Sequence, residues 1–444
     1  MVGPWQWVRG RLLVIALAGA ALIVAGGLGA VGLCKFTSIE CYYLLHGDPL
    51  EQTSGTVSLA EGFSTEVVAS GLDQPTAFDF LPDGRILVGE KEGLVKLIED
   101  GEVASTPVLD LREKVNSALY RGLMAVAVDP DFEQNRFVYV AYSARREGVE
   151  AEKATYVVVS RFVLSGASAG GERVILGNDG EKTGDCAELS ATADCLPSDV
   201  DHIGADIAFA KNGTLFVSTG DGGGHERVEE TAFSAQDVDS LAGKILRVTR
   251  DGRGLASNPF FGGDTNANRS KVWALGLRNP FRLTLAPGAD LPVVADVGWT
   301  TADEISVAPA RANLGWPCFE GRTRTPEYRE TDRCLATYSN GDPTVQPIID
   351  IPHEGVNSVT GGVFYTGDAY PQEYREYFYA DWAQNWIRHA SIGPDGGVLR
   401  DKPSGFAEDA GGPVAFRMGP DGLLYYLALN FRELHRITYA NGGK

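Results

Sequence analysis

Short runs of apolar residues, each interrupted by a turn-forming pair, recur along most of the chain. The clearest runs are 78–88, 207–217 and 416–426, where Asp-Gly or Asn-Gly separates two apolar stretches, and 126–140 and 283–295 are weaker copies. Because Asp-Gly and Asn-Gly favour the tight turns between antiparallel strands, each run predicts a β-hairpin. Long helical periodicity is absent, so we expect an all-β chain.

The number and spread of these hairpins indicate how they are organised. They occur at uneven intervals between residues 58 and 441, and no linker divides this stretch. Repeated hairpins of this kind are typical of a β-propeller, which protects its strand edges by radial repetition. An array of β-sandwiches is the alternative. A doubly wound nicotinamide dehydrogenase is disfavoured, since no Gly-x-Gly-x-x-Gly fingerprint lies in a βαβ pattern.

The N-terminal region has a different pattern. Residues 12–33 are 22 residues without a charge, and Arg9 and Arg11 precede them. At 1.5 Å per residue this segment spans ~33 Å, enough for a bilayer core. We therefore expect a transmembrane signal anchor at 1–34, a linker at 35–57 and a periplasmic or extracellular domain at 58–441, because arginines favour the cytoplasmic side. A cleaved signal peptide and a lipid on Cys34 are the alternatives.

Charge and composition narrow the possible partners. Lys and Arg total 39 against 59 Asp and Glu, which gives a formal net charge of -20. Phosphate backbones and anionic lipid surfaces would be repelled, so nucleic-acid binding is disfavoured. With 44 % hydrophobic and 22 % charged residues, the chain has the composition of a folded globular domain.

Four cysteines fall into two local pairs. Cys186 and Cys195 are nine residues apart, and Cys318 and Cys334 are sixteen apart. An exported domain would oxidise them, and two local disulfides are the economical pairing. Four free thiols are the alternative, and neither spacing is that of a zinc site.

A series of short motifs occurs in a fixed order between about residues 60 and 440. The motifs lie at 122–132, 201–204 (Asp-His-Ile-Gly), 218–223, 241–247, 276–280, 303–305 and 313–317 (Asn-Leu-Gly-Trp-Pro). The series resembles the glucose/sorbosone dehydrogenase family, best known for soluble sugar dehydrogenases that depend on pyrroloquinoline quinone (PQQ). The resemblance implies a six-bladed β-propeller. It extends to Hedgehog-interacting proteins, which bind partners without known sugar oxidation.

Oxidising a sugar at its anomeric carbon requires a base for the hydroxyl proton and an acceptor for the hydride. No side chain accepts hydride, so a cofactor is obligatory, and the resemblance implies PQQ. It also implies that His202 is the base, that Asp221 orients His202 and that Asp201 lies beside the quinone. An imidazole suits this role because it titrates near neutral pH. The alternative is that His202 only satisfies backbone groups at the propeller mouth.

A second group of residues would bind the cofactor. Arg278 and Asn279 could hydrogen-bond the quinone oxygens and stabilise the charge that develops there, which is the role of the matching pair in the family. An arginine that anchors a loop is the alternative. Gly298 and Trp299 align with residues whose backbone carbonyls hold Ca²⁺, a cation that prefers oxygen ligands.

Three positions depart from the family pattern. Tyr120 replaces a cofactor-contacting Gln, Asp206 replaces an Arg, and Gln384 lies near a position where an Arg binds a PQQ carboxylate. Each charged hydrogen bond contributes ~1.5 to 3 kcal/mol, so PQQ affinity should be reduced unless Arg375 or Arg388 compensates. The leading prediction is a PQQ-dependent sugar dehydrogenase. The alternative is a catalytically silent propeller that binds a carbohydrate or protein.

Two other patterns carry weaker signals. The run Asp264-x-Asn266-x-Asn268 imitates the start of a calcium loop, but Arg269 stands where the loop requires Gly. Trp299, Trp316, Trp382 and Trp386 could stack on a sugar ring, although aromatic residues fill propeller cores more often.

Overall fold

The computed structural model describes residues 55–440, apart from 152, 154, 179–185, 187–192, 199–201, 225–226, 342–343, 354 and 394–403. The described residues belong to one compact unit, Gln52–Lys444. The predicted signal anchor at 1–34 lies outside them. Within the described part, no helix is long and apolar enough to cross a membrane.

Six antiparallel sheets form the blades, which we number along the chain. Blade 1 contains β3 (Pro75–Phe80), β4 (Ile86–Glu90), β5 (Leu94–Glu99), β6 (Glu102–Val103) and β7 (Leu109–Asp110). Blade 2 contains β8 (Leu123–Val128), β9 (Phe137–Ser143), β10 (Thr155–Ser165), β11 (Ser168–Leu176) and β12 (Leu196–Ser198). Blade 3 contains β13 (Gly204–Phe209), β14 (Leu215–Thr219), β15 (Lys244–Val248) and β16 (Val272–Leu275).

The second half of the chain supplies the other three blades. Blade 4 contains β17 (Pro280–Leu285), β18 (Pro292–Asp296), β19 (Ala302–Val307) and β22 (Ile349–Pro352). Blade 5 contains β23 (Val359–Phe364), β24 (Tyr377–Asp381), β25 (Trp386–Ala390), β26 (Ser404–Glu408) and β1 (Ser58–Leu59). Blade 6 contains β27 (Pro413–Met418), β28 (Leu424–Ala428), β29 (Glu433–Tyr439) and β2 (Phe63–Ala69).

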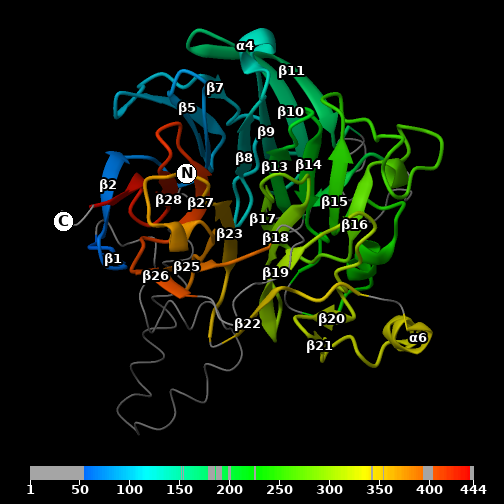
Figure 1. Ribbon diagram of the computed structural model, residues 1–444. Helices are drawn as coiled ribbons and strands as arrows, with labels where there is room; N and C mark the ends of the chain where they lie inside the picture. The colour runs from blue at the N-terminus through cyan, green and yellow to red at the C-terminus, as the bar shows by residue number, and fades with distance from the viewer. Residues whose placement is uncertain are drawn as a thin grey trace, which may run out of the picture. The chain divides into compact units, whose positions relative to one another are not determined.

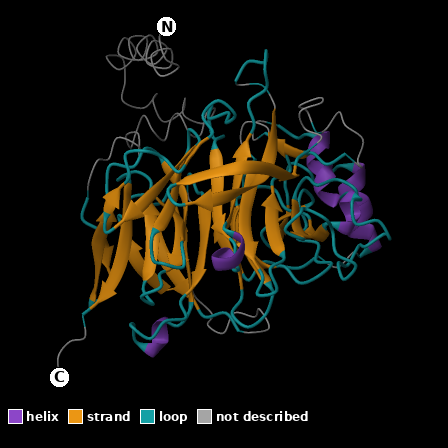
Figure 2. Cartoon of the chain, turned by 90° about the horizontal axis from the view of Figure 1, so that it is seen from above, coloured by secondary structure: helices purple, strands orange, loops and turns teal. Residues whose placement is uncertain are grey.

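Helices and one small hairpin lie in the connections. They are α4 (Phe132–Asn135), α6 (Asp332–Asn340), the 3₁₀ helices η2 (Glu230–Gln236), η3 (Asn268–Ser270) and η4 (Gln372–Tyr374), and the hairpin β20 (Phe319–Glu320) with β21 (Thr323–Arg324). Figure 2 shows the strands in the body of the molecule and loops gathered at both of their ends.

The innermost strands close a ring. Contacts run from β3 to β8, β13, β17, β23 and β27 and back to β3, and these strands meet in the middle of Figure 1. The ring is sealed where β2, from the beginning of the described residues, pairs with the last strand β29, with Phe63 opposite Tyr439. The prediction of a six-bladed propeller is therefore confirmed.

The predicted hairpins are also confirmed. The runs 78–88, 207–217 and 416–426 form β3–β4, β13–β14 and β27–β28, and the two weaker runs form β8–β9 and β17–β18. Gly84, Gly213 and Gly422 have φ values of 90°, 78° and 77°, a left-handed conformation that glycine adopts without a Cβ clash. The turn chemistry thus sets the position of each hairpin.

Most strands bury both faces, because a blade packs against two neighbours. Six apolar clusters fill the spaces between adjacent blades. In β14, Leu215 and Val217 pack toward blade 2, whereas Phe216 packs toward blade 4. Burial of each large apolar side chain contributes ~1.5 to 3 kcal/mol, so these clusters supply most of the cohesion between blades.

Each innermost strand has a β-bulge near its first residue. The pairing shifts occur at Pro75/Ala77, Leu123/Ala125, Gly204/Ile207, Pro280/Arg282, Val359/Gly361 and Pro413/Ala415. A bulge takes a residue out of the ladder and leaves its backbone groups in need of another partner. Three of these bulges direct a carbonyl to one side chain, that of Arg282.

Arg282, on β17, connects four blades at the centre of the ring. Its Nε donates to the Val414 carbonyl at 3.1 Å, Nη1 to the Met124 carbonyl at 3.0 Å and Nη2 to the Thr76 carbonyl at 2.5 Å. These acceptors lie in the bulges of blades 6, 2 and 1. The guanidinium is buried, and this burial lowers the pKa of Arg282. The negative charge of Asp206 acts in the other direction but does not cancel the effect of burial.

Asp206 is the counter-ion of this arginine. Its Oδ1 lies 3.6 Å from Nη1 of Arg282, and its Oδ2 accepts the Leu283 amide at 3.0 Å. Its charge is balanced by Arg282 within the ring of inner strands.

Replacing Arg282 tests this connection. In Arg282→Met, three buried carbonyls and the Asp206 carboxylate lose their partner, and breaking a buried ion pair costs about 3 to 5 kcal/mol. We expect the free energy of unfolding, measured by urea denaturation, to fall by about that amount. Arg85→Met, which breaks the surface pair with Asp83, is the control and should cost about 1 kcal/mol at most. Equal losses in both variants would contradict the role of Arg282.

Candidate functional site

The sequence-predicted site residues lie at one end of the propeller, which we call the mouth. In every blade, the loop before the inner strand and the loop between the second and third strands reach this same end, because adjacent strands are antiparallel. Loops of the first kind carry Tyr120, His202, Arg278 and Asn279, and loops of the second kind carry Asp221, Gly298, Trp299 and Gln384. Asp201 lies outside the described residues.

His202 and Asp221 form a buried pair at the mouth. Nδ1 of His202 lies 2.8 Å from Oδ1 of Asp221, and both side chains are almost fully buried. A carboxylate fixes the tautomer in which Nδ1 carries the proton, so Nε2 becomes the basic nitrogen. The predicted orientation of His202 by Asp221 therefore has the required geometry.

Asp221 is itself held by two further donors. The Gly223 amide donates to Oδ1 at 2.8 Å, and the indole Nε1 of Trp316 donates to Oδ2 at 2.7 Å. Burial acts to raise the pKa of Asp221, but His202, the hydrogen bonds and Arg278 together lower it below its usual value. Asp221 is thus kept as a carboxylate. Sequence reasoning did not assign this role to Trp316.

Two glycines allow the loops of this pair to approach each other. A Cβ on Gly220 would lie 2.1 Å from the His202 carbonyl oxygen. Gly204 has a φ of 62°, and a Cβ there would lie 2.5 Å from the Gly220 amide nitrogen. Any other residue at either position would push His202 and Asp221 apart.

Arg278 lies next to this pair. Its carbonyl accepts the Asp221 amide at 2.8 Å, and its Nη1 donates to the carbonyls of Val297 at 3.0 Å and Gly298 at 2.6 Å. The guanidinium also lies 5.4 Å from the Trp316 ring centre. Burial lowers the pKa of Arg278, although Asp221 and three other carboxylates oppose that shift. Its buried Nε has no hydrogen-bond partner within the described part of the chain.

Buried carboxylates surround a small cavity beside Arg278. Asp296, Glu304 and Glu320 line it together with Arg278 and Trp316. One oxygen of Glu320, Oε1, accepts the amides of residues 299–302 at 2.6 to 3.2 Å, which fixes the loop that carries Gly298. Burial raises the pKa of Asp296 to about 7, and burial together with Asp296 raises the pKa of Glu304 well above its usual value.

The calcium assignment to Gly298 and Trp299 does not fit this arrangement. The Gly298 carbonyl already accepts a hydrogen bond from the Arg278 guanidinium. A divalent cation on the same oxygen would be repelled by that positive charge. Among the described residues, no group of three or more His, Cys, Asp or Glu side chains is arranged to hold a metal ion.

The other residues predicted to contact the cofactor differ in their exposure and in their hydrogen-bond partners. The Tyr120 side chain is largely exposed, and Asn279 is partly buried. Nε2 of Gln384 donates to the Val356 carbonyl at 2.8 Å, so this donor joins two mouth loops. Arg375 and Arg388, which could compensate for the lost PQQ-binding cations, lie in different places. Arg375 pairs with Asp368 in the β23–β24 connection at the opposite end, whereas Arg388 lies on β25 over the Trp386 ring.

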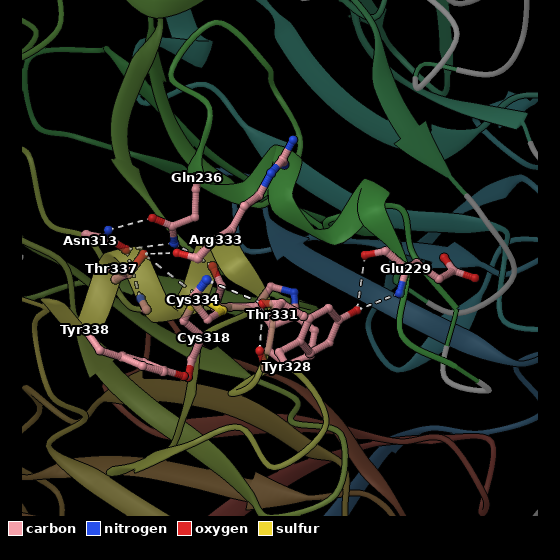
Figure 3. Close-up of a disulfide and its surroundings, with 12 residues drawn as sticks. Glu229, Gln236, Asn313, Cys318, Tyr328, Thr331, Arg333, Cys334, Thr337 and Tyr338 are labelled. Atoms are coloured by element: carbon pink, nitrogen blue, oxygen red, sulfur yellow. Dashed lines mark hydrogen bonds between the residues drawn. A yellow bond between two sulfur atoms is a disulfide. The ribbon is translucent and has the colours of Figure 1, made fainter. Parts of the chain in front are cut away.

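An insertion between β19 and β22 supports the mouth. Trp299, Trp316 and Tyr328 pack edge to face or tilted against one another. The Tyr328 hydroxyl accepts the Glu229 amide at 3.0 Å, and the disulfide Cys318–Cys334 attaches α6 beside them (Figure 3). Cys186 and Cys195 are also joined, so both predicted disulfides are confirmed.

Comparison with known proteins identifies relatives of the whole propeller. The family model for glucose/sorbosone dehydrogenase matches residues 72–432. The solved apo-form of the soluble aldose sugar dehydrogenase from Escherichia coli is 25 % identical, covers 85 % of this chain and 99 % of its own, and superposes with a TM-score of 0.68. Quinoprotein glucose dehydrogenase B from Acinetobacter calcoaceticus is 24 % identical over 70 % of this chain and 63 % of that protein. The human Hedgehog-interacting protein is 28 % identical over 50 % of this chain and 31 % of that protein.

The buried carboxylates predict a pH dependence of stability. The pKa values of Glu304 and Asp296 are higher in the folded protein than in the unfolded chain, so the fold favours their protonated forms. The contribution of Asp296 is most favourable below about pH 4 and is lost as pH rises through about 7, and that of Glu304 is lost only as pH rises well above the usual pKa of a glutamate. We therefore expect the free energy of unfolding to fall less between pH 5 and pH 8 in Glu304→Gln than in the wild type.

Urea denaturation at the two pH values measures this difference. Glutamine keeps a carbonyl oxygen for the hydrogen bond from the Gly321 amide, so the variant should still fold. Asp83→Asn is the control, because the pKa of Asp83 is lowered and its titration ends below pH 5. An unchanged pH dependence in Glu304→Gln would refute the protonated state of Glu304.

Proposed function

Because the chain belongs to the glucose/sorbosone dehydrogenase family, we propose that it is a PQQ-dependent sugar dehydrogenase that oxidises an aldose at its anomeric carbon. The observation that carries this proposal is the buried pair of His202 and Asp221 next to Arg278 at the propeller mouth. These residues combine a base, a group that orients the base and a cation in one small volume. Such a combination suits proton removal coupled to hydride transfer.

His202 acts as the general base in this proposal. Its Nε2 accepts the proton of the anomeric hydroxyl, and Asp221 stabilises the imidazolium that results. Trp316 and Gly223 hold Asp221 in place through hydrogen bonds of 2.7 and 2.8 Å. Because the pair is buried, the electrostatic stabilisation is stronger than it would be in water.

PQQ, when bound at the mouth, would supply the acceptor for the hydride. Arg278 fits a quinone because its buried Nε lacks a partner among the described residues and its side chain lines the cavity at the mouth. Asn279, next to Arg278 in the chain, and Tyr120, in another mouth loop, would also contact the cofactor. We include in the proposed set Asp201, which would lie beside the quinone, and Gln384, whose Nε2 is already engaged. No calcium ion takes part in this proposal.

The second candidate is a propeller that binds a carbohydrate or a protein at its mouth without catalysis. The similarity to the human Hedgehog-interacting protein favours it, as does the departure from the family pattern at Tyr120 and Gln384. Both candidates use the same end of the propeller. Only the dehydrogenase requires PQQ.

Two substitutions separate the candidates. We expect His202→Gln to bind PQQ like the wild type and to lower kcat for dye-linked aldose oxidation by ~10² to 10⁴-fold, the usual contribution of a general base. Arg278→Ala should also weaken PQQ binding, since its charge contacts the cofactor before hydride transfer. The PQQ absorption spectrum and the dye assay measure these two effects.

Oxidation that continues undiminished in His202→Gln would show that His202 is not the general base. Absence of both PQQ binding and oxidation across a panel of aldoses would favour the silent propeller.

We further propose that this domain is anchored to a membrane and lies in the periplasm or outside the cell. Two disulfides support this location, because such bonds persist in oxidising compartments, and the apolar segment 12–33 would supply the anchor. Protease added to cells with a permeabilised outer layer should then digest the region beyond residue 60. Protection of that region, while an external control protein is digested, would exclude this location.

A further inference from the structure

A second histidine–aspartate pair lies at the mouth. His353 is the first residue after β22, and its Nε2 lies 2.8 Å from Oδ1 of Asp303, at the second position of β19. The Asp303 side chain is fully buried, whereas 14 % of the His353 side chain is exposed. The imidazole is therefore reachable from solvent while the carboxylate that holds it is not.

The bonds around Asp303 fix the orientation of the imidazole. The Gly298 amide donates to Oδ1 and the Val359 amide donates to Oδ2, both at 2.8 Å. A carboxylate only accepts, so Nε2 of His353 carries the proton of the shared hydrogen bond and Nδ1 is the nitrogen opposite to it. The structure gives Nδ1 no hydrogen-bond partner within the described residues.

The loop that carries His353 has a fixed position. The His353 amide donates to the Thr301 carbonyl at 3.0 Å, and Gln384 donates to the Val356 carbonyl at 2.8 Å. The loop runs at the mouth from the outer strand of blade 4 to β23, the inner strand of blade 5. His353 is therefore held at the same end of the propeller as His202.

A chain of hydrogen bonds links this pair to the candidate site. Gly298 donates to Asp303 through its amide and accepts from Arg278 through its carbonyl. Arg278 in turn accepts the amide of Asp221. The two histidine–aspartate pairs are thus linked through the same buried arginine.

His353 differs from the structural histidines of the chain. His389 and His435 also pair with carboxylates, but their side chains are only 7 % and 5 % exposed and they lie within strands. His353 lies in a mouth loop and has the most exposed imidazole of the described histidines. A histidine that served only to satisfy Asp303 would not need this exposure.

We propose that His353 is a second substrate-binding residue, whose Nδ1 forms a hydrogen bond with a sugar hydroxyl other than the one that is oxidised. This inference rests on the proposed function, because it assumes a sugar at the mouth. Asp303 holds the ring so that Nδ1 keeps one direction. The expected ligand is an aldose with a free hydroxyl near its anomeric carbon.

Substitution of His353 tests this role through the split between KM and kcat. In His353→Gln, the amide can still donate to Asp303, but the ring nitrogen that binds the sugar is lost. We expect KM for glucose to rise by ~3 to 10-fold, the value of one neutral hydrogen bond, with kcat and PQQ binding close to those of the wild type. His353→Phe should show at least the same rise.

Deoxy sugars identify the hydroxyl. One of 2-, 3-, 4- and 6-deoxyglucose should show the raised KM in the wild type and no further increase in His353→Gln or His353→Phe. His389→Gln is the matched control, since it removes an imidazole from a carboxylate pair at the opposite end of blade 5. A KM unchanged in both His353 variants, or raised equally in His389→Gln, would overturn the proposal.

A binding measurement keeps this test separate from the proposed dehydrogenase. Glucose added to the full chain, with and without PQQ, should shift the imidazole ¹⁵N resonances of His353 and leave those of His389 unchanged. If the wild type neither binds PQQ nor oxidises any aldose, the dehydrogenase proposal fails, and a shift at His353 still supports sugar binding there. No shift at His353 in either condition would overturn the inference about His353 alone.

Discussion

The contact between Arg282 and the bulged carbonyls at the centre of the ring is the constraint on which the rest of the structure depends. Six blades packed through apolar surfaces can slide, because dispersion and hydrophobic contacts have little direction. Three charged hydrogen bonds to Val414, Met124 and Thr76 have direction, and they relate blades 6, 2 and 1 to blade 4. The mouth loops begin at these same bulges, so their mutual positions follow from this contact.

At the mouth, many buried charged groups are stabilised either by opposite charges or by protonation. Arg278 lies within reach of Asp221, Asp296, Asp303 and Glu320. Its carbonyl accepts the Asp221 amide from one mouth loop, and its guanidinium donates to the Val297 carbonyl of another. A charge in such a place requires either a counter-charge or protonation of its neighbours. Asp221 remains charged beside His202, whereas Asp296 and Glu304 are shifted toward the neutral form. The site thus contains an ionised carboxylate that can take part in chemistry, together with protonated carboxylates that reduce the number of buried negative charges.

Local signals were sufficient to predict the hairpins and the disulfides, whereas the candidate site residues came from the family resemblance. A tight turn such as Asp83-Gly84 acts over a few residues, and Cys318 lies only 16 residues from Cys334. Long-range partners could not be predicted. Trp316 meets Asp221 across 95 residues, and Asp206 pairs with Arg282 from another blade. For the same reason, the hydrogen-bonded pair of His353 and Asp303, which are 50 residues apart, could not be predicted from the sequence.

The pairing of β2 with β29 has a consequence for biosynthesis. Residues 63–69 leave the ribosome well before their partner strand 433–439 is synthesised. The segment 63–69 therefore remains an unpaired strand, and the ring cannot close, until residues 433–439 are available. Loss of either strand would leave an open edge in blade 6, and such an edge is prone to association.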